Sequence, residues 1–157
     1  MKSCCVTGPR DIPKNKIEYV RQELRRETIQ AIEDGFTSFF SSMAKGTDLE
    51  FASIVAEKKK ENTDLLLEAV IPYADRMKSN DKRYRELIRQ CSSIKLISHE
   101  QDGDCYFATN RYLTENSQRI IAVSDGRPKS NTAQIIRMAT AKGLDLRIID
   151  ISEHQNE

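Results

Sequence analysis

Short apolar runs alternate along the whole chain with longer segments whose apolar residues recur at helical spacing. Turn residues such as Gly8-Pro9 and Asp34-Gly35 separate them, which is typical of strands and helices joined by short loops. Strands are predicted at residues 3–7, 36–43, 65–73, 94–98, 120–123 and 144–151. Helices are predicted from Pro13 to Asp34-Gly35, over residues 49–61, 84–91 and 104–116, and around residues 135–139 with an end at Gly143.

The alternation of strands and helices indicates the fold class. Tyr84, Leu87, Ile88 and Cys91 show the helical pattern most clearly, at positions i, i+3, i+4 and i+7. Repeated strand–helix–strand units predict right-handed crossovers and a mostly parallel sheet with helices on both faces. We therefore expect an α/β protein with a single three-layer Rossmann-like domain at residues 1–151 and a polar C-terminal tail at 152–157. A length of 157 residues suits one such domain.

Composition narrows the classes of partner. The chain has 25 Lys and Arg against 24 Asp and Glu, a formal net charge of +1, which argues against a general nucleic-acid binder. No apolar run approaches the roughly 20 residues of a membrane span, so we expect no membrane partner and a cytoplasmic protein. The four cysteines, Cys4, Cys5, Cys91 and Cys105, form no CxxC pair, and we expect them to be small buried residues rather than metal ligands. Neither a metal nor a cofactor is predicted.

Candidate chemistry lies in the loops that follow the strands, because ligands of open parallel sheets bind beyond the carboxyl ends of the strands. Those loops carry Arg10, Lys45, Arg76, Arg127 and Lys129, and three of them contain glycine. Glycine allows close approach to backbone, and helix N-termini favour anions, so the loops are expected to converge on one concave site for an anionic ligand. Each loop alone also reads as a plain turn. The GxGxxG and GxxxxGK[ST] signatures are absent.

The same segments resemble a known family. VTGPR, MAKGTDLEFASIVAE, IPYADR and CYFATNRYLTENSQRIIAVSDGRPKSNT occur in the order seen in the YpsA-like family. That family belongs to the SLOG superfamily of Rossmann-like proteins, whose members include the lonely-guy phosphoribohydrolases and the DNA-processing protein A family. The resemblance covers nearly the whole chain and implies a pocket for a nucleotide or nucleotide-derived small molecule.

Matching the family pattern residue by residue gives the candidate ligand-binding residues. They are Thr7, Gly8, Arg10, Lys45, Gly46, Asp48, Pro72, Asn110, Arg111, Asp125, Gly126 and Thr132. Arg10 and Arg111 would pair with phosphate or carboxylate groups, with the Arg10 anion held over the helix N-terminus that follows Gly46. Asp125 would accept hydrogen bonds from a ribose or base, or orient Arg111.

Two departures from the family pattern bear on function. The family's usual Gly-Gly-Thr turn reads Ser130-Asn131-Thr132 here, and the position of the lonely-guy catalytic glutamate holds Ile135, which cannot transfer a proton. The expectation is therefore a protein that binds or senses a nucleotide-like ligand, without an assigned catalytic residue. The alternatives are a nucleotide hydrolase that cleaves the N-glycosidic bond with another carboxylate, and a nucleic-acid-binding protein. The sequence leaves the oligomeric state open, a homodimer included.

Overall fold

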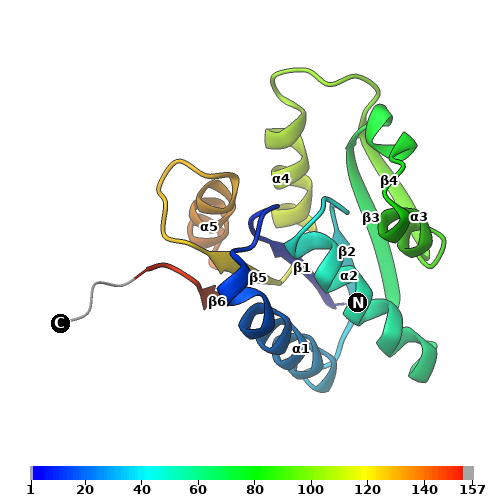
Figure 1. The fold of residues 1–157 in the computed structure, drawn as a ribbon, viewed down its shortest axis with the longest axis vertical. Coiled ribbons are helices and arrows are strands. Elements are labelled where there is room, and N and C mark those ends of the chain that lie inside the picture. Colours follow the sequence, from blue (N-terminus) through cyan, green and yellow to red (C-terminus); the bar gives the residue numbers. More distant parts are fainter. Residues whose placement is uncertain (1, 154–157) are drawn as a thin grey trace.

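The computed structural model describes residues 2–153, so most of the predicted tail, residues 154–157, lies outside the described part. The strands are β1 (Lys2–Thr7), β2 (Phe36–Ser41), β3 (Leu66–Tyr73), β4 (Ser93–Ser98), β5 (Arg119–Ser124) and β6 (Asp145–Asp150). The helices are η1 (Lys14–Lys16), α1 (Ile17–Glu33), α2 (Thr47–Glu61), η2 (Ala74–Lys78), α3 (Lys82–Ile88), α4 (Cys105–Asn116) and α5 (Asn131–Lys142), where η marks a 3₁₀ turn (Figure 1). The predicted alternation of strands and helices is confirmed.

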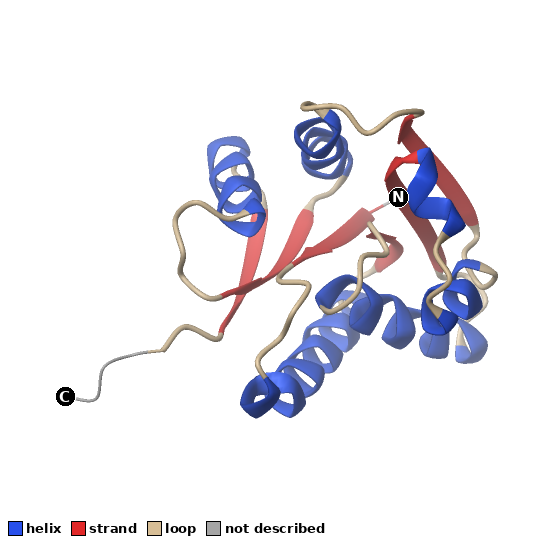
Figure 2. Cartoon of the chain, turned by 45° about the horizontal axis from the view of Figure 1, so that its top comes forward, coloured by secondary structure: helices blue, strands red, loops and turns tan. Residues whose placement is uncertain are grey.

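All the strand pairs of the sheet are parallel, in the order β4-β3-β2-β1-β5-β6. Helices α1, α2 and α3 cover one face, and α4 and α5 cover the other (Figure 2). Successive strand residues point to opposite faces, so Cys4 packs in the core under α1 and α2 while Cys5 packs with Leu113 and Ile135 under α4 and α5. The fold is therefore the predicted three-layer Rossmann-like α/β domain.

The side of the sheet on which new strands are added changes at β1. From β1 to β4 each new strand is added on one side, and α4 then returns the chain so that β5 pairs with the free side of β1. Thr7 at the end of β1 lies beside Ala122 of β5 in the register. The helices that follow these two strands, α1 and α5, leave toward opposite faces of the sheet (Figure 2). A crevice at the carboxyl ends of β1 and β5 follows from this topology.

The second strand is shorter than the sequence pattern predicts, ending at Ser41 rather than at residue 43. Met43 adopts a positive φ of 62°, a conformation that strands do not contain. The Ser41 hydroxyl fixes this turn, because it accepts a hydrogen bond from the Met43 amide at 3.1 Å and donates one to the Asp48 carbonyl at 2.9 Å. The turn directs the chain into α2, whose first residues lie at the carboxyl end of β1.

The cysteines are free thiols, and three of the four are buried. Burial raises the pKa of the Cys5 thiol to about 12 and that of the Cys91 thiol to about 11. Since the thiolate is the reactive form, these side chains act as packing residues at neutral pH.

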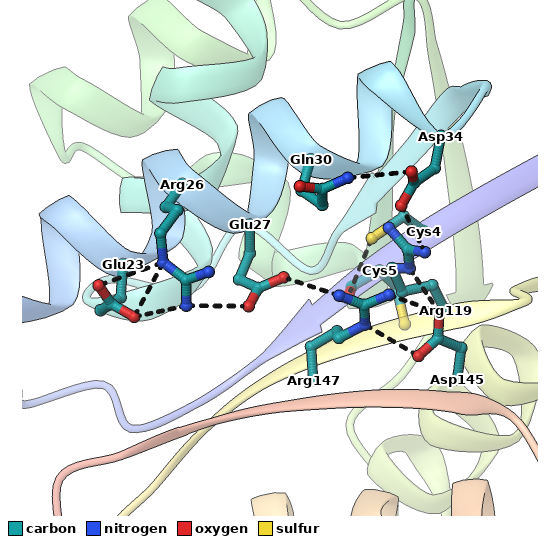
Figure 3. Close-up of polar contacts among 10 residues, drawn as sticks. All are labelled: Cys4, Cys5, Glu23, Arg26, Glu27, Gln30, Asp34, Arg119, Asp145 and Arg147. Atoms are coloured by element: carbon teal, nitrogen blue, oxygen red, sulfur yellow. Dashed lines mark hydrogen bonds and ion pairs between the residues drawn. The ribbon is translucent and has the colours of Figure 1, made fainter.

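A cluster of charged residues joins α1 to β5 and β6 at the amino-terminal edge of the sheet (Figure 3). Arg119, only 5% exposed, bonds to Asp34 at 2.9 Å and to Asp145 at 2.8 Å. Its guanidinium also lies 4.5 Å from the centroid of the Phe36 ring. Arg119 thereby holds together the end of α1 and the starts of β5 and β6. This cluster lies at the opposite edge of the sheet from the crevice.

We expect Arg119→Ala to lower the free energy of unfolding by about 3 kcal/mol, because two charge-assisted hydrogen bonds and a ring contact are lost from a buried position. Hydrogen bonds from arginines lower the pKa of Asp34, through Arg119, and of Asp145, through Arg147 and then Arg119. The hydrogen bonds of Arg119 to these two carboxylates therefore stabilise the folded state at neutral pH. This stabilisation is lost as the pH falls below the ordinary carboxyl pKa of about 4.

Denaturant unfolding of the wild type and of Arg119→Ala at pH 7 and pH 3 measures the loss of stability and its dependence on pH. Arg26→Ala is the matched control, since its exposed side chain bonds mainly to Glu23 three residues earlier and should contribute much less to stability than Arg119. Equal losses for the two variants at pH 7 would contradict the assigned role of Arg119.

Candidate ligand-binding cavity

A cavity of about 730 Å³ lies at the carboxyl edge of the sheet. Its walls come from the ends of β1 and β5, from the loops after β1, β2 and β5, and from Pro72 at the end of β3. Arg76 in η2, Asp48 in the first turn of α2, α4 and the first two turns of α5 complete them. The cavity therefore occupies the place where the topology opens a crevice between β1 and β5.

Most of the candidate residues lie on this cavity. Those that line it are Thr7, Gly8, Arg10, Asp48, Pro72, Asn110, Asp125 and Thr132. Lys45, Gly46, Arg111 and Gly126 do not line it. Lys45 instead forms an ion pair with Asp11 at 2.9 Å, with both side chains largely exposed. Gly126 adopts a φ of +84° in the turn after β5, where it shapes the loop that carries Asp125.

Helix geometry explains why Arg111 points elsewhere. The cavity-lining residues of α4 are Tyr106, Thr109, Asn110 and Leu113, which form one helical face. Arg111 is rotated about 100° from Asn110, and its guanidinium lies over the ring of Phe107. Asp125 accordingly does not orient Arg111: it accepts hydrogen bonds from the Arg127 amide at 3.0 Å and the Arg127 Nε at 2.7 Å.

The loop after β1 packs against the N-terminus of α2, the place where the anion held by Arg10 is expected. The Pro9 carbonyl accepts hydrogen bonds from the Thr47 amide at 3.1 Å and the Thr47 hydroxyl at 2.9 Å. A Cβ at Gly8 would overlap the Thr47 side chain, and one at Gly46 would overlap the Arg10 carbonyl. These two glycines therefore allow the loop after β1 to pack on the start of α2.

Positive charge dominates the cavity wall. Five lining residues are cationic, namely Arg10, Arg76, Arg127, Lys129 and Arg137, against the carboxyl groups of Asp48 and Asp125. Arg10 donates to the Tyr106 hydroxyl at 3.2 Å, Arg76 to the Ser42 carbonyl at 3.0 Å, and Arg137 to the Pro128 carbonyl at 3.0 Å. Neutral acceptors fix these guanidinium groups in place but leave their charge available to an anion.

Asp48 is the buried carboxyl group of the site. It lies in the first turn of α2, is 9% exposed, and its Oδ2 accepts a hydrogen bond of 3.4 Å from the Ala44 amide. Burial raises its pKa to about 7, and the Ala44 hydrogen bond with the charges of Arg76 and Arg10 offsets this only in part. The carboxyl group can therefore gain or lose a proton near neutral pH.

The N-terminus of α5 is the helix end that opens onto the cavity. The Ser130 hydroxyl caps it by accepting a hydrogen bond from the Ala133 amide at 3.0 Å. Within the described residues, the amides of Asn131 and Thr132 have no protein acceptor, and the Thr132 hydroxyl lies 3.3 Å from that of Thr7. Free amides, hydroxyls and the positive end of the helix dipole are features that bind anions.

Tyr106, Gln134 and Arg137 are among the polar lining residues that were not sequence candidates. Gln134 and Arg137 lie four and seven positions after Ser130, so helical spacing from the capping residue could have identified them. Tyr106 carries no such signal, because its place depends on how the long connection after β4 returns to β1.

Residues 2–153 provide neither a metal centre nor a membrane span. This part of the chain contains no cluster of three or more His, Cys, Asp or Glu side chains arranged to hold a metal ion. Nor does it contain a helix with the length and apolar character to cross a membrane.

Comparison of the sequence with family models matches residues 10–154 to YpsA, described as the YspA SLOG family. The chain is 27% identical to a UPF0398 protein of Bacillus cereus over 156 aligned residues, covering 91% of this chain and 85% of the relative. A UPF0398 protein of Bacillus thuringiensis shows the same identity and coverage.

Two solved structures share the fold. DNA processing protein A from Helicobacter pylori, described with a single-stranded DNA binding mode, aligns with a TM-score of 0.70 at 16% identity, covering 99% of this chain and 67% of that one. The protein TM1055 aligns with a TM-score of 0.57 at 17% identity, covering 93% of this chain and 72% of that one.

Replacing Asp48 by the isosteric Asn tests the raised pKa. In the wild-type protein the folded state holds the Asp48 proton up to about pH 7, whereas an unfolded carboxyl releases it near pH 4, so this group lowers stability as the pH rises between those values. We expect Asp48→Asn to raise the melting temperature at pH 8 and to change it little at pH 4. Thermal unfolding at both pH values measures the difference, and a gain of equal size at both would contradict it.

Proposed function

Given that this chain belongs to the YspA SLOG family, we propose that its cavity binds a nucleotide or nucleotide-derived small molecule through the anionic group of that ligand. The observation that carries the proposal is the convergence of five cationic side chains and the open N-terminus of α5 on one cavity. A role in binding or sensing such a molecule in the reducing cytoplasm agrees with the free thiols.

The dimensions of the cavity support a small ligand. A volume of about 730 Å³ lies within the roughly 300–1,000 Å³ typical of small-molecule sites. Single-stranded nucleic acid is bound by aromatic platforms along a positive groove, and Tyr106 is the one aromatic residue that lines this cavity within the described chain. The net charge of +1 also argues against a general nucleic-acid binder. The proposal for this chain therefore differs from the DNA binding described for the Helicobacter pylori protein.

Arg10 is the residue whose replacement tests anion binding. Its guanidinium lies at the cavity wall, positioned by the Tyr106 hydroxyl and ring. We expect Arg10→Ala to lose a charge-assisted contact of about 1.5–3 kcal/mol, a roughly 10- to 150-fold weaker affinity for adenosine monophosphate by calorimetric titration.

Arg111→Ala is the matched control for this measurement, because it removes an arginine that lies outside the cavity, and its affinity should equal that of the wild type. Equal losses for the two variants would indicate a general charge effect rather than a site. A parallel titration with a single-stranded oligonucleotide that bound more tightly than the mononucleotide would favour the nucleic-acid alternative.

The cavity wall also bears on catalysis. Ile135, at the position of the lonely-guy glutamate, is 1% exposed and lines the cavity. An aliphatic side chain moves no proton, so we expect no release of adenine when the protein is incubated with adenosine monophosphate. Chromatography of the mixture tests this. Adenine formation at an enzymatic rate, abolished in Asp48→Asn or Asp125→Asn, would establish a hydrolase that uses a different carboxyl group.

A further inference from the structure

Three carboxamide side chains meet on one wall of the cavity. Asn110 of α4 donates from its Nδ2 to the Oδ1 of Asn131 at 2.8 Å and to the Oε1 of Gln134 at 2.6 Å, both on α5. Asn110 is only 2% exposed, and all three residues line the cavity. This set is called the carboxamide cluster below.

The internal hydrogen bonds fix the carboxamide cluster without exhausting it. Both hydrogens of the Asn110 amide are used, whereas Asn131 and Gln134 each keep an NH₂ group and a second lone pair on the bonded oxygen. Exchanging oxygen and nitrogen in all three side chains preserves both internal bonds and still leaves free donors and acceptors. In either arrangement, neighbouring donors and acceptors therefore face the cavity in a preorganised position.

The carboxamide cluster is uncharged, in a cavity whose charged groups are mostly cationic. Arg10, Arg127 and Lys129 come from loops and suit the anionic part of a ligand. A carboxamide places a donor and an acceptor side by side in one plane, which matches the edge of a nucleobase, as in the pairing of Asn or Gln with adenine. Ribose hydroxyls are the same in every nucleotide and provide no comparable pattern.

We propose that the carboxamide cluster formed by Asn110, Asn131 and Gln134 is a base-recognition subsite that makes the cavity selective among nucleotides. This inference rests on the proposed function, since it assigns the uncharged end of the same ligand. The cluster also joins α4 to α5, and a purely structural role would affect the affinities for all ligands alike. Selectivity among bases is therefore the property that separates the two roles.

The test measures the affinities of five probes by calorimetric titration: the 5′-monophosphates of adenosine, guanosine, cytidine and uridine, and ribose 5-phosphate, which lacks a base. The proteins are wild type, Asn131→Ala, Gln134→Ala and the control Thr140→Ala. Thr140 is an exposed α5 residue outside the cavity, and its hydroxyl bonds to the Ile136 carbonyl. Buried Asn110 is left unchanged, so that folding is preserved.

We expect wild-type affinities for the four nucleotides to differ by about tenfold or more, the discrimination of one good base contact. In Asn131→Ala and Gln134→Ala the preferred nucleotide should lose about tenfold and the differences should shrink, while ribose 5-phosphate and the Thr140→Ala control remain at wild-type affinity.

Three results would overturn the proposal. Unchanged selectivity in both cluster variants, or equal losses for all five probes, would assign the cluster to holding α5 in place. Equal wild-type affinity for all five probes would remove base recognition while leaving anion binding intact. If the wild-type protein bound none of them, the proposed function and this inference would fail together.

Discussion

The pairing of β1 with β2 on one side and β5 on the other is the constraint on which the site depends. Because all the strands of the described chain run parallel, their carboxyl ends meet at one edge, and the return of the chain beside β1 sends α1 and α5 to opposite faces. No crossover covers the ends of these two strands. Loops that are distant in sequence, after β1, β2 and β5, therefore converge on one cavity without any special motif.

Arginine is used differently at the two edges of the sheet. At the amino-terminal edge, Arg119 is neutralised by Asp34 and Asp145 and fixes α1 against β5 and β6. At the carboxyl edge, Arg10 and Arg76 bond to neutral oxygens, so their positions are fixed without an ion pair that neutralises their charge. Arg127, paired with Asp125, is intermediate. A chain with a net charge of +1 thus concentrates positive potential at one place.

Periodicity in the sequence was sufficient to predict the strands, the helices and the sheet class, because each buried face repeats at a fixed spacing. Local backbone chemistry limited the boundaries: the positive φ of Met43 ends β2 early, and no apolar pattern signals it. At the site, position after a strand located Thr7 and Asp125, and resemblance added Asn110. The same resemblance also selected Arg111, but the rotation of one helical residue takes its side chain away from the cavity.

The two helix N-termini at the cavity show why motif residues divide between holding the fold and facing a ligand. At α2, glycines at positions 8 and 46 let the Pro9 carbonyl accept hydrogen bonds from Thr47, so the loop after β1 packs on this helix end. At α5, a side chain provides the cap, because the Ser130 hydroxyl satisfies the Ala133 amide. A hydroxyl takes one amide and leaves those of Asn131 and Thr132 open. The loop after β1 thus contributes packing on α2 to the cavity, and the start of α5 contributes amides that a ligand can bind.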